Sequence, residues 1–149
     1  MATNVVNFKQ QQATDMANFL QTQEWSRFCT FTTPYELTLP SVRRLCGRFH
    51  DRATKRVFRG KAPRLFWVAE KFQAKDGYHT HALLYYDKEI FGNDLLAELD
   101  DCYQVVSAAK QNGNTKFRVQ FTNYDKRKAA GKYCSKYLLK KYSDYDLLV

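Results

Sequence analysis

Two of the three histidines, His79 and His81, lie one residue apart in an apolar run of residues that favour β-structure. Successive side chains of a strand point to opposite faces, so both imidazoles face the same side, about 7 Å apart at Cα. That spacing allows both to bind one metal ion, although such a pair can equally be two polar residues on a sheet face. His50 has no partner at ligand spacing and is interpreted as structural or as part of the surface.

Glu70 is the best candidate for an acidic third ligand, because an unpaired carboxylate would be costly in its apolar run, 65–72. Pairing Phe72 with Tyr78 across a five-residue loop would set Glu70 opposite Thr80, on the wrong face. A bulge or a different loop length is then needed to bring Glu70 to the histidines. Two imidazoles and a carboxylate leave open coordination positions and suit Mn²⁺ or Mg²⁺ acting on a phosphate.

A second candidate group lies near the end of the chain, where Tyr133, Lys136, Tyr137 and Lys140 follow helical spacing and share one stripe. A plain amphipathic helix with half-buried tyrosines and extended lysines would show the same pattern. A phenol with a pKa of ~10 is a poor nucleophile at neutral pH, but a neighbouring cation favours the phenolate. Attack on DNA would give a 5′-phosphotyrosyl bond that conserves energy for rejoining, and two tyrosines one turn apart could alternate.

Charge indicates a class of partner, because 24 Lys and Arg stand against 15 Asp and Glu, a formal net charge of +9. The excess is concentrated in two segments, 43–64 and 126–141, which fits binding to a polyanion with nearby aromatic residues stacking on bases. A solvated basic surface is the alternative interpretation. The residues predicted to line a DNA groove are Arg43, Arg44, Arg48, Arg52, Lys55, Arg56, Lys126, Arg127 and Lys128.

The length of 149 residues suits one domain, 1–149, and no run of about 20 apolar residues predicts a membrane helix. No signal peptide pattern is present at the N-terminus, and no Walker P-loop occurs. The cysteines have neither zinc-site nor disulfide-framework spacing, which favours buried thiols in an intracellular, reducing setting. They are Cys29, Cys46, Cys102 and Cys134.

The elements that position these residues are predicted from periodicity and turn signals. Residues 1–25 are expected to be loosely structured, with one short helix at 14–22. Ser41 is the predicted N-cap of the next helix, and Asp76-Gly77 marks a hairpin. The order β-α-β-β-α-β-α predicts an α+β fold, an antiparallel sheet with helices packed on it. The predicted strands are 27–33, 65–72, 78–86 and 116–122, and the later helices are 41–57, 93–103 and 126–141.

With these pieces together, the chain resembles the HUH endonucleases, the nicking domains of rolling-circle replication initiators. Residues 28–34 are similar to the first family motif and 79–85 to the His-x-His motif, although Thr80 stands where the family usually has a bulky hydrophobic residue. Residues 129–140 resemble the third motif in the two-tyrosine form of the gene A type of single-stranded DNA phages. The resemblance extends over about 27–141.

The resemblance implies a Rep-like sheet with a ferredoxin-like core and a divalent metal, Mn²⁺ or Mg²⁺, at His79 and His81, with Glu70 mapped as the acidic helper. It implies that Tyr133 is the first nucleophile and Tyr137 the second. Lys136 and Lys140 are then electrostatic helpers. The expected activity is metal-dependent, single-strand-specific DNA nicking and strand transfer that initiates rolling-circle replication.

The expected substrate is an origin hairpin or displaced strand in the cytoplasm of a bacterial host, with a host or viral helicase and polymerase as further partners. Three alternatives remain open from sequence. They are a non-catalytic single-stranded nucleic-acid-binding module, a metal-binding regulator that reads duplex DNA, and a transposase or relaxase with the same chemistry.

Overall fold

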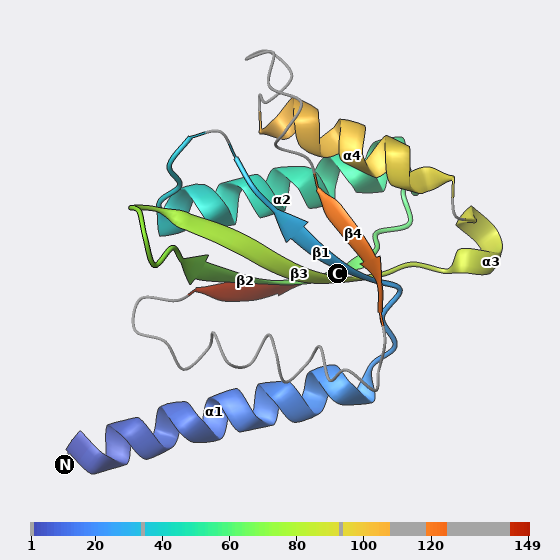
Figure 1. The fold of residues 1–149 in the computed structure, drawn as a ribbon. Coiled ribbons are helices and arrows are strands. Elements are labelled where there is room, and N and C mark those ends of the chain that lie inside the picture. The colour runs from blue at the N-terminus through green and yellow to red at the C-terminus, as the bar shows by residue number, and fades with distance from the viewer. Residues whose placement is uncertain (1, 34, 93, 108–118, 125–143) are drawn as a thin grey trace.

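The computed structural model of the protein describes residues 2–33, 35–92, 94–107, 119–124 and 144–149 (Figure 1). Its five strands form one antiparallel sheet in the order β4-β1-β3-β2-β5, which confirms the predicted α+β class. β3, with both candidate histidines, is the central strand. The strands are β1 (Arg27–Phe31), β2 (Arg64–Lys71), β3 (Tyr78–Tyr85), β4 (Gln120–Asn123) and β5 (Tyr145–Leu148), and the helices are α1 (Ala2–Thr22), α2 (Leu39–Arg56), α3 (Lys88–Phe91) and α4 (Leu95–Val106).

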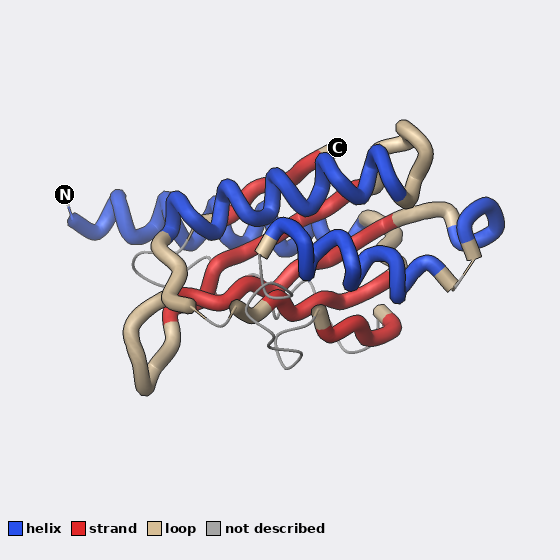
Figure 2. The backbone as a smooth tube through the Cα atoms, turned by 90° about the horizontal axis from the view of Figure 1, so that it is seen from above, coloured by secondary structure: helices blue, strands red, loops and turns tan. Residues whose placement is uncertain are grey.

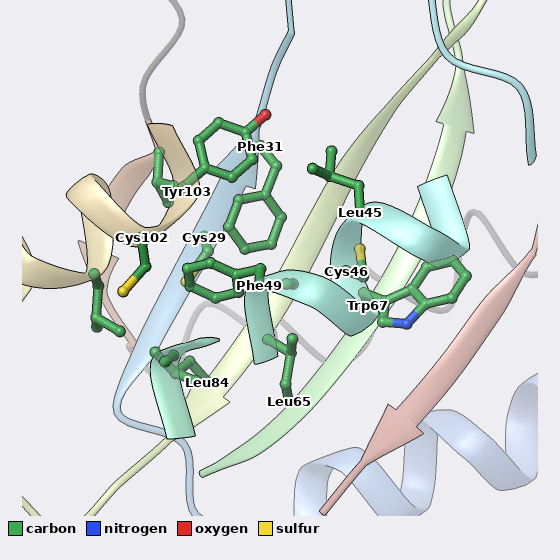
Figure 3. Close-up of a cluster of buried hydrophobic side chains, with 14 of the residues drawn as sticks. Cys29, Phe31, Leu45, Cys46, Phe49, Leu65, Trp67, Leu84, Cys102 and Tyr103 are labelled. Atoms are coloured by element: carbon green, nitrogen blue, oxygen red, sulfur yellow. The ribbon is translucent and has the colours of Figure 1, made fainter. Parts of the chain in front are cut away.

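Helices α2 and α4 cover one face of the sheet, as the ribbon and the view turned by 90° show (Figures 1 and 2). The apolar residues of α2 recur at helical spacing, so they form a single stripe toward the strands. Phe49 of this stripe contacts Phe31 of β1 and Tyr103 of α4 with ring centroids 5.1 and 6.4 Å apart (Figure 3). The buried strand residues of this layer alternate along each strand and include Trp67 and Ala82.

The opposite face of the sheet carries the other half of each alternation. Phe66, Val68 and Leu83 pack there with Leu20 of α1 and Trp25, and the Trp25 indole donates to the Leu20 carbonyl at 2.8 Å. This smaller cluster holds the C-terminal end of α1 against the sheet. His79 and His81 are in step with Leu83 along β3, so they belong to this α1 face.

Three boundaries differ from the sequence prediction. The N-terminal segment, expected to be loosely structured, forms the helix α1 over 21 residues. Helix α2 begins earlier than predicted, because Thr38 is the N-cap and accepts from the Ser41 amide at 3.3 Å, with Pro40 in the first turn. Strand β5 was not predicted at all. The predicted helix 126–141 and the first part of the strand predicted at 116–122 lie outside the described residues.

The turn between β2 and β3 settles the position of Glu70. Lys71 pairs with Tyr78, so Glu70 pairs with His79 and shares its face, and no bulge is needed. The five-residue loop considered from sequence was one residue too short. Phe72 falls in the turn, where its amide donates to the Gly77 carbonyl at 3.1 Å.

Gly77 ends this turn in a conformation that favours glycine, with φ +97°. An added Cβ would lie 2.7 Å from Cγ of Glu36 and 3.3 Å from the amide nitrogen of Leu37, both in the segment before α2. Gly77→Ala is therefore expected to lower the free energy of unfolding by more than about 1 kcal/mol, measured by urea denaturation. Gly47→Ala is the matched control, because Gly47 lies in α2 with open space around it, and a gain of about 0.5–1 kcal/mol is expected. Equal effects of the two substitutions would contradict this account of the turn.

Candidate metal centre

Glu70, His79 and His81 converge on the α1 face of the sheet. Their three ligand atoms all lie within 4.8 Å of one another, an arrangement that could hold a metal ion. The Glu70 Oε2 atom is 2.9 Å from Nε2 of His81 and 3.5 Å from Nε2 of His79. The convergence follows directly from the strand register, because Glu70 and His79 are a cross-strand pair and His81 is the next residue on the same face.

The donor set fits a hard divalent cation. Mg²⁺ holds octahedral ligands at about 2.1 Å, so neighbouring ligand atoms lie about 3 Å apart, close to the separations found here. The side chains of Glu70 and His79 are 15% and 19% exposed, and that of His81 is 7% exposed. The group is thus largely dehydrated on the sheet side and open at Glu70 and His79. One carboxylate and two imidazoles leave further coordination positions for substrate oxygens.

Thr80, between the two histidines, points to the other face and is fully buried under α2. Its hydroxyl interacts with the thiol of Cys46, and burial raises the pKa of that thiol more than the Thr80 hydrogen bond lowers it. Cys46 therefore remains a neutral thiol and is neither a nucleophile nor a metal ligand. Cys29 and Cys102 are buried as well, as predicted. Burial also raises the pKa of Tyr103, which removes it as a candidate nucleophile.

His50 has a structural role, as the sequence interpretation allowed. It lies on α2 and its Nε2 atom is 2.8 Å from the carbonyl oxygen of Pro63, just before β2. This contact ties the helix to the start of the strand that carries Glu70. His50 is on the layer opposite the metal centre.

Arg43, predicted to contact DNA, is engaged within the protein. Its guanidinium donates to both carboxylate oxygens of Asp144, at 2.9 and 3.1 Å, and to Asp146 at 3.0 Å. It also lies 5.3 Å from the centre of the Trp67 ring. These contacts attach α2 to β5, the edge strand that the sequence analysis missed. The signal was present as two aspartates close to the C-terminus, but their partner is about 100 residues away.

The other basic residues of α2 differ in their surroundings. Arg52 is half-buried beside Cys102, and Lys55 pairs with Asp51 at 3.1 Å. Arg44, Arg48 and Arg56 are exposed. All belong to the helix that covers the sheet face opposite Glu70 and the histidines. Lys126, Arg127 and Lys128 and the stripe of Tyr133, Lys136, Tyr137 and Lys140 lie outside the described residues.

Two aromatic residues next to the histidines were not singled out from sequence. Phe72 stacks on His79 and Phe28 stacks on His81. The available signal was weak: Phe72 is two residues after Glu70, hence in step with it, and Phe28 is in a strand whose partner could not be read from the sequence.

A five-stranded antiparallel α+β fold with a His-x-His strand beside a carboxylate fits a rolling-circle Rep domain of HUH type. Residues 26–142 match the family model of the replication-associated protein ORF2. The match covers more than half of the chain, which therefore belongs to this family. No curated protein and no solved structure matches the chain significantly. Family membership indicates a role in DNA replication and an interaction with DNA. Among the described residues, no helix is long and apolar enough to cross a membrane.

Proposed function

We propose that this protein is a metal-dependent, single-strand-specific DNA endonuclease and strand transferase that initiates rolling-circle replication. The observation that carries the proposal is the convergence of Glu70, His79 and His81 on one open sheet face in a chain of a replication-associated family. Mn²⁺ or Mg²⁺ bound by these three residues would polarise the scissile phosphate. The metal centre alone does not distinguish hydrolysis from covalent transfer, so the tyrosines decide the class of reaction.

Tyr133 is the proposed first nucleophile and Tyr137 the second. The phenolic oxygen attacks the phosphorus, a 5′-phosphotyrosyl bond forms, the bond to the 3′ oxygen breaks, and the released 3′-hydroxyl takes up a proton. The reverse attack by a 3′-hydroxyl rejoins the strand and frees the tyrosine. Lys136 and Lys140 are the proposed electrostatic helpers, because an ammonium group favours the phenolate over the phenol.

The described ends of the connection that contains these tyrosines support this assignment. Residue 124 follows β4 at one edge of the sheet, and residue 144 precedes β5 at the other. β3, with His79 and His81, is the central strand between these edges. The carbonyl of Asp144 accepts from the amide of Ala69 at 2.9 Å, so the C-terminal end of the connection lies beside the residue that precedes Glu70.

The proposal is tested with a randomised pool of labelled single-stranded DNA oligonucleotides on a denaturing SDS gel. With Mn²⁺ present, a labelled band that migrates with the protein is expected, and EDTA should remove it. Binding without any band, in Mn²⁺ or in Mg²⁺, would instead identify a non-catalytic binding module. Preference for duplex DNA together with tight Zn²⁺ binding would identify a regulator.

The basic surface of α2 is proposed to contact a part of the DNA away from the metal centre, because α2 covers the other face of the sheet. Changing Arg44, Arg48 and Arg56 together to Gln should weaken binding of long single strands and lower the slope of log affinity against log salt by about 2. Fluorescence anisotropy over a salt series measures both. Lys88→Gln, an exposed position on α3, controls for general charge. An unchanged slope in the triple variant would remove α2 from the DNA-binding surface.

The cellular setting follows from the same proposal. A nicking protein of this kind acts in the cytoplasm of a bacterial host on an origin hairpin or displaced strand. A host or viral helicase and polymerase would then extend the 3′-hydroxyl released by the nick. A transposase or relaxase would use the same chemistry on a different DNA site, and sequencing of the DNA joined to the protein distinguishes these outcomes.

A further inference from the structure

Four aromatic rings form a continuous row through the candidate metal centre. The Phe72 ring stacks on His79 with centroids 4.6 Å apart and planes at 17°. His79 meets His81 edge to face, with centroids 4.7 Å apart and planes at 68°. Phe28 of β1 then stacks on His81 at 5.9 Å and 25°. The two imidazoles are therefore bracketed by two phenyl rings.

Phe72 is held in this position by the turn between β2 and β3. Its amide closes the turn by donating to Gly77, and its ring also lies 4.3 Å from the ammonium of Lys75. It is two residues after Glu70, so it stands on the same side of the hairpin as the carboxylate. Its side chain is half-buried, and it belongs to neither of the two core clusters of the described residues.

We propose that Phe72 is a positioning residue for the metal ligand His79. An imidazole binds a metal well only if its ring is already turned so that the ligating nitrogen faces the ion, and partners outside the first set of ligands usually fix that orientation. Near-parallel stacking restricts rotation of the His79 ring about its own side-chain bonds and leaves Nε2 directed at Glu70, 3.5 Å from Oε2. The inference rests on the proposed metal-binding function.

The test measures Mn²⁺ affinity by isothermal titration calorimetry on the full chain without DNA. Phe72→Ala is expected to bind Mn²⁺ about tenfold more weakly than the unmodified chain, the range found when outer partners of metal ligands are lost. Phe72→Tyr keeps the ring and should restore affinity to within about twofold. Phe72→Leu keeps most of the apolar volume without a ring plane and should resemble Phe72→Ala.

Phe91→Ala is the matched control. Phe91 is also half-buried and pairs with another ring, Phe58, at 5.1 Å, but it lies in α3, outside the metal centre. Its loss should leave Mn²⁺ affinity unchanged, and thermal unfolding of every variant shows that the fold is retained. Mn²⁺ binding by the unmodified chain with equal affinity in Phe72→Ala would overturn this proposal alone. Absence of Mn²⁺ binding by the unmodified chain would overturn the proposed function as well.

Discussion

Replacing Tyr133 and Tyr137 together by Phe is expected to abolish the covalent protein–DNA band completely while DNA binding remains. The substitution removes only the two hydroxyl oxygens that could form the bond to phosphorus, and the aromatic rings are kept. A single substitution should leave a band if the other tyrosine can substitute for it. Of the two single variants, Tyr133→Phe should show the larger loss, because Tyr133 is the proposed first nucleophile. The measurement is the SDS gel with labelled DNA and Mn²⁺.

The control for this experiment is Tyr145→Phe. Tyr145 begins β5, pairs with Val68 and packs on the same sheet face as the metal centre, with its ring 6.2 Å from that of Phe66. It therefore tests whether any tyrosine near this face contributes to the band. An unchanged band is expected for Tyr145→Phe. A band that survives in the double variant would contradict the assignment of both nucleophiles.

Glu70→Gln is expected to weaken Mn²⁺ binding at least about 100-fold, and to reduce formation of the covalent band in proportion when Mn²⁺ is limiting. Glu70 is the one anionic member of the described ligand group, and one of its oxygens faces both imidazoles. An amide keeps the shape of the side chain but removes the charge that a hard divalent cation prefers. The loss should exceed the roughly 10–100-fold effect known for partners one shell further out.

Calorimetry with Mn²⁺ and the gel assay across a Mn²⁺ series measure these two effects. Excess Mn²⁺ should restore part of the band in Glu70→Gln, because the two histidines remain. Glu89→Gln is the control, since Glu89 is exposed on α3 and outside the metal centre. Affinity in Glu70→Gln equal to that of the control would mean that Glu70 is not a ligand.

Much of the fold was readable because its signals are local. Strands β1, β2 and β3 are runs of β-branched and aromatic residues that alternate or stay apolar, and α2 and α4 show buried residues at helical spacing. β5 has only four residues, 145–148, one of them an aspartate, too short for a reliable period. Its place in the sheet depends on pairing with β2 and on the Arg43 contacts, which are both long-range.

For the candidate site, local periodicity was enough to place His79 and His81 on one face, because the two-residue period of a strand allows nothing else. Glu70 could also be singled out, since a carboxylate in an apolar strand needs a partner. Its meeting with the histidines needed the folded hairpin, because one residue more or less in the turn moves a whole strand to the opposite face. The fold likewise puts the arginines of α2 across the sheet from the metal centre and binds Arg43 to Asp144 and Asp146. A periodic pattern fixes which side chains share a face, whereas packing between distant segments fixes what that face meets.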